Sequence, residues 1–228
     1  MRYLSRVRLR CDASVAVLAP LLLGKTGRGG GGQPGHHLIW SLFADRSNRP
    51  RDFLWREMAS GNFYVLSARR PENQHGLFEI AEPKPFSPVL EPGDRIRFSL
   101  RANPVIRRRD PKRGRSVKHD VVMDALRSHR KGERAGRRLA IVREQGLAWL
   151  QGQGSRTGFT IRPDEVRADG YDRHRIPRRG TAPPMSFSTL DFDGILTVVD
   201  PAVFLAAVAC GFGASKAYGC GLMLIRRA

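Results

Sequence analysis

The chain has 228 residues, 41% of them hydrophobic, which is enough to bury the core of one or two domains. Lysine and arginine number 40 against 21 aspartates and glutamates, so the formal net charge is +19 at pH 7 and nucleic acid is the expected partner. Three cysteines without paired spacing, and no apolar stretch long enough to cross a bilayer, argue against disulfide-rich, zinc-binding and membrane-spanning classes and favour the reducing cytoplasm.

The pattern of segments in residues 1–82 predicts a first small domain. Its segments are a strand beginning at Arg6–Arg10, a helix over His37–Phe43, and strands over Arg51–Met58 and Asn62–Ala68. A glycine-rich loop over residues 27–35 precedes the helix. Together these segments make a β-α-β-β start.

A second domain is expected over residues 93–228, after a linker at residues 83–92 whose four prolines stiffen the chain. Its segments are strands over Arg95–Arg101, Phe187–Val199 and Leu222–Ile225, a hairpin over Arg107–Arg115, and helices over Arg138–Gln151 and from Pro201 to Gly211. Helices crossing antiparallel sheets, twice over, predict an α+β chain of two tandem ferredoxin-like (RRM-like) domains.

The run from Gly211 to Gly221 holds four glycines and Lys216 in eleven residues. Glycine lets backbone N–H groups converge on an anion, and lysine adds a mobile cation. We therefore expect a phosphate-binding nest made by Gly211, Gly213, Ser215, Gly219 and Gly221. The alternative for Lys216 is an exposed cation at a turn.

The predicted hairpin is strongly basic, and RNA binding is the function expected of it. The residues expected to reach an RNA stem are Arg107, Arg108, Arg109, Lys112, Arg113 and Arg115. Because the major groove of A-form RNA is deep and narrow, entry near a stem end or a distorted step is favoured. Arg49, Arg51 and Arg56 extend this track, whereas the basic stretch Arg127–Arg138 has no assigned role. The alternative is a solvated run of charge.

One acidic pair, Asp191 and Asp193, is the only candidate for a metal site along the chain. Both carboxylates would face one side of a strand, but no third ligand stands nearby in the sequence. We therefore predict no metal, and interpret the pair as a solvated strand edge.

An ordered series of segments resembles one family, the CRISPR repeat-processing endoribonucleases of type I-E systems, called CasE. The segments are YLSRV at 3–7, HHLIWSLF at 36–43, RDFLWR at 51–56, KPF at 84–86, PGDRIRFSLRANP at 92–104, AWL at 148–150, FDGIL at 192–196 and the glycine-rich run. The resemblance implies two RRM-like domains and a nuclease without metal or cofactor that cuts CRISPR precursor RNA at the base of the repeat hairpin. It also implies retention of the mature crRNA and membership of the Cascade complex.

RNA cleavage of this kind has a chemistry that the residues can support. The ribose 2′-OH attacks the neighbouring phosphate and expels the 5′ oxygen, giving a 2′,3′-cyclic phosphate, so the protein must supply proton transfer and positive charge. By resemblance, His36 is the catalytic histidine, as base or acid, with His37 as the other candidate. A tyrosine assists in some family members three residues before the histidine. That position is Gln33 here, so Lys216 is the candidate for stabilising charge.

Two other functions compete with the nuclease. A non-catalytic structured-RNA-binding protein would explain the charge and the RRM-like pattern but gives no reason for the histidine motif. A DNA-binding module would explain the charge alone, and the sequence has no helix-turn-helix or zinc-finger pattern to support it.

Overall fold

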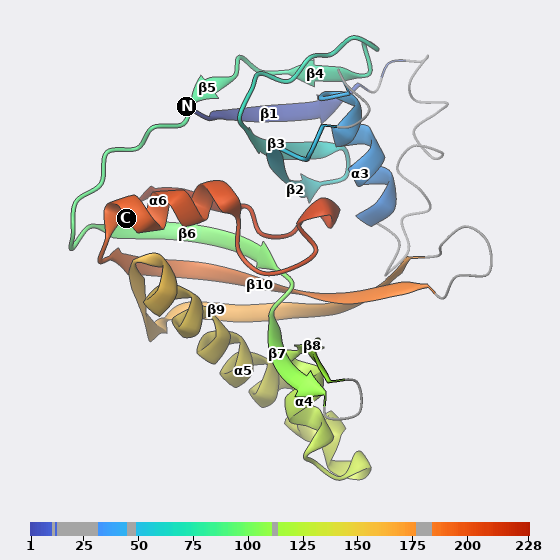
Figure 1. Cartoon of the computed structure of the whole chain (residues 1–228), viewed down its shortest axis with the longest axis vertical. Coiled ribbons are helices and arrows are strands. Elements are labelled where there is room, and N and C mark those ends of the chain that lie inside the picture. Colours follow the sequence, from blue (N-terminus) through green and yellow to red (C-terminus); the bar gives the residue numbers. More distant parts are fainter. Residues whose placement is uncertain (11, 13–31, 45–48, 111–113, 177–183) are drawn as a thin grey trace.

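The computed structural model of the chain describes residues 1–10, 12, 32–44, 49–110, 114–176 and 184–228. Two antiparallel sheets lie one above the other, with the N-terminal half of the chain above and the C-terminal half below in the view of Figure 1. This arrangement confirms the predicted α+β class with antiparallel sheets.

The N-terminal sheet has the strand order β2-β3-β1-β4, with β5 also paired to β1. Its elements are β1 (Tyr3–Leu9), α3 (Gly32–Ser41), β2 (Phe53–Ala59), β3 (Asn62–Ser67), β4 (Phe78–Ile80) and β5 (Lys84–Pro85). In β1 the side chains of Val7 and Leu9 are buried while Arg6 and Arg8 are exposed, as the period of two requires. Leu38 and Ile39 of α3 pack into the same core, which fixes the helix on the sheet.

The C-terminal sheet has the order β11-β6-β10-β9, with α5 and α6 packed on one face. Its elements are β6 (Arg95–Ala102), α5 (Arg134–Thr157), β9 (Phe159–Ile176), β10 (Met185–Val198), α6 (Pro201–Cys210), the short helix η2 (Lys216–Tyr218) and β11 (Met223–Arg227). In chain order this is β-α-β-β-α-β with the last and first strands adjacent, the ferredoxin-like pattern. Asp200 caps α6 by accepting a 3.0 Å hydrogen bond from the amide of Val203.

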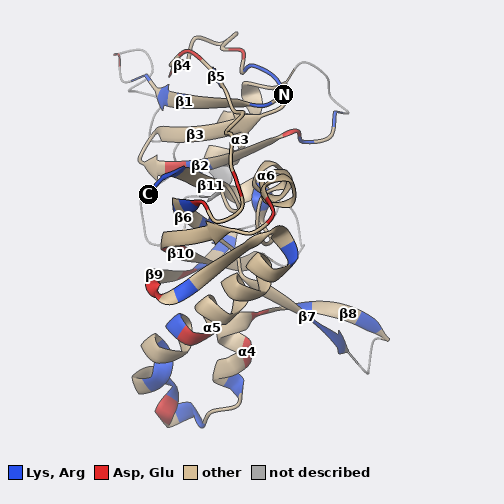
Figure 2. Ribbon diagram, turned by 90° about the vertical axis from the view of Figure 1, so that its left-hand side faces the viewer, with Lys and Arg blue, Asp and Glu red and all other residues tan. Residues whose placement is uncertain are grey.

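An insertion between β6 and α5 projects from this half of the chain (Figure 2). It consists of the hairpin β7 (Val105–Asp110) and β8 (Arg115–Asp120), the helix α4 (Val121–Arg127) and the short helix η1 (Lys131–Glu133). The hairpin forms a two-stranded sheet of its own. Asp120 ends β8 and caps α4 through a 2.6 Å hydrogen bond from the amide of Met123.

Contacts between the halves are both apolar and polar. Leu54 and Leu66 of the N-terminal sheet belong to the buried cluster that holds the C-terminal core. Arg56, only 6% exposed, donates a 2.9 Å hydrogen bond to the hydroxyl of Ser99 in β6. The predicted limits of the domains stay a prediction, and Lys84–Pro85, at the start of the predicted linker, pairs with β1.

Candidate active site at the junction of the two sheets

Helix α3 places His36 where the two halves of the chain meet. The helix packs so closely on β2 that a Cβ added at Gly35 would lie 2.7 Å from Cη2 of Trp55. His36 is half-buried, and its ring centroid lies 5.7 Å from that of Tyr218 in η2. His37 is exposed. Of the two candidate histidines, His36 is therefore the one that faces the C-terminal half.

The surroundings of His36 favour its neutral form. Burial lowers its pKa, the imidazole of His37 and the guanidinium of Arg51 lower it further, and the backbone of Ala217 opposes them. Its Nδ1 atom is buried without a hydrogen-bond partner in the described part of the chain. A ring that stays neutral at neutral pH can accept a proton from a hydroxyl group.

Arg51 and Lys216 lie in the same electrostatic neighbourhood as His36. Burial lowers the pKa of Lys216, Cys210 opposes this, and the Arg51 guanidinium lowers it further. Arg51 is itself half-buried, and burial lowers its pKa too. Nζ of Lys216 donates a 2.8 Å hydrogen bond to the carbonyl of Cys210, at the end of α6. Of the two predicted cations, Arg51 therefore acts directly on His36, and Lys216, which interacts with Arg51, also caps a helix.

Contacts within the protein shape the glycine-rich segment. The glycines with positive φ are Gly211, Gly213, Gly219 and Gly221. At Gly213 an added Cβ would lie 2.7 Å from the carbonyl oxygen of Asn103. The same carbonyl accepts a 3.1 Å hydrogen bond from the amide of Ala214, and the Asn103 side chain donates a 2.7 Å hydrogen bond to the Ser215 hydroxyl. Phosphate binding by this segment stays a prediction, and Asn103 is a residue that the sequence did not single out.

The predicted basic hairpin is present as β7 and β8. Its exposed arginines in the described residues include Arg107, Arg109 and Arg115. Arg108 instead pairs with Asp124 of α4, with nitrogen–oxygen distances of 2.9 and 2.6 Å. The predicted contacts Lys112 and Arg113 lie outside the described residues.

A groove of about 700 Å³ joins the hairpin to the glycine-rich segment. Its lining includes Arg107, Gly211, Gly213 and Lys216 from the predicted site, and Lys118 and Arg156 in addition. The structure therefore brings one hairpin arginine to the predicted nest. Arg49, near Arg51 in the chain, is half-buried. The prediction that Arg56 extends the RNA-binding track is wrong, because its side chain is buried and donates a hydrogen bond to Ser99.

The prediction that Asp191 and Asp193 lie at a solvated strand edge is wrong, because β10 lies between β6 and β9 and is not an edge. Asp191 accepts two hydrogen bonds of 2.8 Å from Arg101, and Arg56 lies 3.8 Å away. This charged cluster joins β2 of the first sheet to β6 and β10 of the second. No local sequence pattern could have found it, because its members come from strands far apart in the chain.

Two further findings concern metals and membranes. Within the residues that the structure describes, no three His, Cys, Asp or Glu side chains gather in a way that could hold a metal ion. None of the described helices combines the length and the apolar character needed to cross a membrane. Cys210 and Cys220 are free thiols, and Cys11 lies outside the described residues.

Fold and site together define a basic protein of two ferredoxin-like halves with a half-buried histidine at their junction. A profile of the family described as "CRISPR associated protein" matches residues 2–227 of the chain. The chain therefore belongs to this family, and the resemblance predicted from the sequence is confirmed.

Named relatives agree with this assignment. The CRISPR-associated endoribonuclease Cse3 of Thermus thermophilus is 27% identical over 197 residues, which cover 82% of this chain and 79% of that protein. The Cascade subunit CasE of Escherichia coli is 27% identical over 206 residues, covering 82% and 88%.

Solved structures show the same fold. T. thermophilus Cse3 bound to an RNA representing a pre-cleavage complex has a TM-score of 0.68 at 24% identity, covering 99% of this chain and 98% of that one. E. coli Cas6e has a TM-score of 0.55 at 22% identity, covering 99% and 100%. These likenesses support the tandem ferredoxin-like architecture.

Proposed function

We propose that the chain is an endoribonuclease that processes CRISPR precursor RNA, cutting at the base of the repeat hairpin. Family membership and two relatives named as a CRISPR endoribonuclease and a Cascade subunit support RNA cleavage in this system. The observation that carries the proposal for this chain is the position of His36. Its half-buried ring lies against η2, the half-buried Arg51 acts on it electrostatically, and Lys216 is the first residue of η2.

The proposed reaction uses a nucleophile that belongs to the RNA. As the base, His36 takes the proton from the 2′-OH, and the departing 5′ oxygen takes a proton from water. As the acid, protonated His36 gives its proton to the departing 5′ oxygen, and water takes the 2′-OH proton. In both cases the 2′ oxygen forms a bond to phosphorus as the bond to the 5′ oxygen breaks. Arg51 and Lys216 stabilise the negative charge that develops on the phosphate. The products are a 2′,3′-cyclic phosphate and a 5′-hydroxyl. Because the nucleophile comes from the ribose and an imidazole carries out a proton transfer, the proposed step requires no metal ion.

Binding partners follow from the same proposal. The precursor RNA is held by the basic hairpin and the adjoining groove, and the mature crRNA stays bound after cleavage. The relative named as a Cascade subunit supports assembly of this chain with other Cascade subunits in the cytoplasm.

Cleavage of a repeat hairpin in excess EDTA tests the proposal. We expect cutting that survives the chelator, yields a cyclic phosphate, and is lost in His36→Ala while RNA binding is kept. His37→Ala is the matched control, because it removes the adjacent but exposed imidazole. Binding without cleavage by the unaltered protein would favour a non-catalytic RNA-binding protein, and equal cutting by His36→Ala would move the catalytic role elsewhere.

A further inference from the structure

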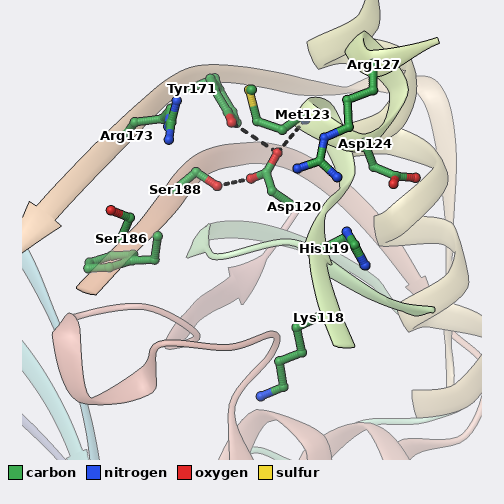
Figure 3. Close-up of a pocket in the computed structure, with 11 residues that line it drawn as sticks. Lys118, His119, Asp120, Met123, Asp124, Arg127, Tyr171, Arg173, Ser186 and Ser188 are labelled. Carbon is green, nitrogen blue, oxygen red and sulfur yellow. Dashed lines mark hydrogen bonds between the residues drawn. The ribbon is translucent and has the colours of Figure 1, made fainter. Parts of the chain in front are cut away.

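A second basic hollow, apart from the groove beside Lys216, lies where the insertion meets the long strands of the C-terminal sheet. It has a volume of about 200 Å³ and is bounded by β8, α4, β9 and β10 (Figure 3). Three of its lining cations come from three different elements: Lys118 from β8, Arg127 from α4 and Arg173 from β9. All three are exposed, and the proposed reaction uses none of them.

The acidic side chains in the hollow already have partners. Asp120 accepts hydrogen bonds from the amide of Met123 at 2.6 Å, the hydroxyl of Tyr171 at 3.0 Å and the hydroxyl of Ser188. Burial and the nearby Asp120 raise the pKa of Tyr171 to about 12, so the phenol keeps the proton that it donates. Asp124 pairs with Arg108.

These bonds leave the cations available to an outside anion. Across the described ranges, no ion pair joins Lys118, Arg127 or Arg173 to a carboxylate of the protein. Figure 3 shows Arg127 and Arg173 above Asp120, and Lys118 below it with its amine directed away from Asp120. A further guanidinium, that of Arg138, lies 5.2 Å from the ring centre of Tyr171 and adds positive charge beside this lining residue of the hollow.

The hollow adjoins the candidate active site along two routes. Lys118 also lines the groove that contains Lys216. Phe187 also lines a smaller cleft that contains Tyr218, whose ring lies 5.7 Å from that of His36. Lys118 and Phe187 therefore connect the hollow to two pockets beside the candidate active site.

We propose that this hollow binds a phosphate of the RNA backbone outside the step that is cleaved. The inference rests on the proposed function, because the ligand is another part of the same RNA. Arginine forms charge-assisted, often bidentate hydrogen bonds to phosphate, and cations from three elements define a position rather than a diffuse attraction. The site positions the substrate and takes no part in the chemistry.

The proposal also gives a role to the basic stretch that the sequence left unassigned. Beyond Arg127 the exposed residues Arg130, Lys131 and Arg137 continue the positive surface over the end of α4 and the start of α5 (Figure 2). Arg134 holds this turn by donating a 3.0 Å hydrogen bond to the carbonyl of His129. The insertion therefore extends the phosphate-binding track away from the cleavage site.

The test measures RNA binding as a function of salt in two matched double variants. Arg127→Gln with Arg173→Gln removes two charges from the hollow, and Lys84→Gln with Arg227→Gln removes two exposed charges elsewhere. Each pair is placed in a His36→Ala background, and the dissociation constant for a CRISPR repeat hairpin is measured between about 50 and 200 mM KCl. Loss of one phosphate contact should weaken binding about tenfold and reduce the slope of log K against log salt by about 0.7 to 0.9. The control pair should change both quantities much less.

A charge-conserving pair, Arg127→Lys with Arg173→Lys, should restore most of the salt slope but less of the affinity, because lysine cannot form the bidentate contact. Equal affinity and slope in the hollow and control pairs would overturn the inference while the proposed function stood. Failure of the unaltered protein to bind the hairpin would instead overturn the proposed function, and this inference with it.

Discussion

Replacing Gly213 by alanine is expected to destabilise the protein far more than the same change at Gly76, a glycine with positive φ that has open space around it. Gly213 has φ of 75°, and an added Cβ would lie 2.7 Å from the backbone oxygen of Asn103 and 3.2 Å from the indole of Trp149. The carbonyl of Asn103 cannot rotate away freely, because it accepts the amide of Ala214 at 3.1 Å. The glycine therefore serves close backbone packing as well as an unusual backbone angle.

The expected loss of unfolding free energy in Gly213→Ala has three parts. The left-handed conformation costs a residue with a Cβ about 1–2 kcal/mol. Displacing the Asn103 carbonyl removes one hydrogen bond, at about 1 kcal/mol, and crowding against Trp149 costs about 1–3 kcal/mol. The expected loss of unfolding free energy is about 3–6 kcal/mol, which for a chain of this size lowers Tm by about 6–24 °C.

The matched control is Gly76→Ala. Gly76 has φ of 63°, and an added Cβ would have no atom within 4 Å, so only the conformational cost of about 1–2 kcal/mol applies. Thermal unfolding of both variants by circular dichroism measures the difference. Equal Tm values would refute the reasoning that the contact with Asn103, and not the backbone angle alone, requires glycine at position 213.

Three further predictions concern the site and the junction. If His36 is the base, the acidic limb of the pH profile of kcat/KM should lie below pH 6.5, because burial lowers the pKa of His36 and keeps the ring neutral. If His36 is the acid, kcat/KM should instead fall as the pH rises through that region. A limb that is unchanged in a His36→Ala variant with residual activity would contradict both roles. Tyr218→Ala should lower cleavage at least tenfold and Tyr218→Phe much less, because the ring packs against His36; equal losses in single-turnover assays would assign the role to the hydroxyl. Asp191→Asn should lower the free energy of unfolding in urea by about 1–3 kcal/mol, because Arg101 loses its charged acceptor. Asp164→Asn, at a fully exposed pair, should leave the urea midpoint nearly unchanged.

Much of the fold follows from local patterns in the chain. The alternation in Arg95–Arg101 marks β6, whose apolar side chains face the helices, and Asp200-Pro201 marks the start of α6. The long strand β9 was not predicted. Its residues Arg162–Asp164 include proline and charge, and its pairing with β10 depends on a register that no local signal carries.

In the candidate site, too, some residues can be predicted from local sequence patterns and others cannot. His36 and Lys216 stand in recognisable motifs, so sequence reasoning selects them. Two of their neighbours cannot be selected in that way. Tyr218 approaches His36 only when the two halves pack together, and Asn103 meets Gly213 and Ser215 only through the folding of the C-terminal half. The error at Asp191 has the same origin, since a carboxylate on a central strand and one on an edge look alike in sequence.

The buried cluster that Leu54 and Leu66 share with the C-terminal core has a consequence for cleavage of the chain itself. A protease that nicks the stretch after β5, between residues 86 and 92, would break the covalent tether but not this apolar seam. The two fragments should stay associated and elute as one species under native conditions, and part only in denaturant. Phe86 and Leu90 of the tether also pack against this cluster, and the seam holds the His36 imidazole on one fragment beside η2 on the other.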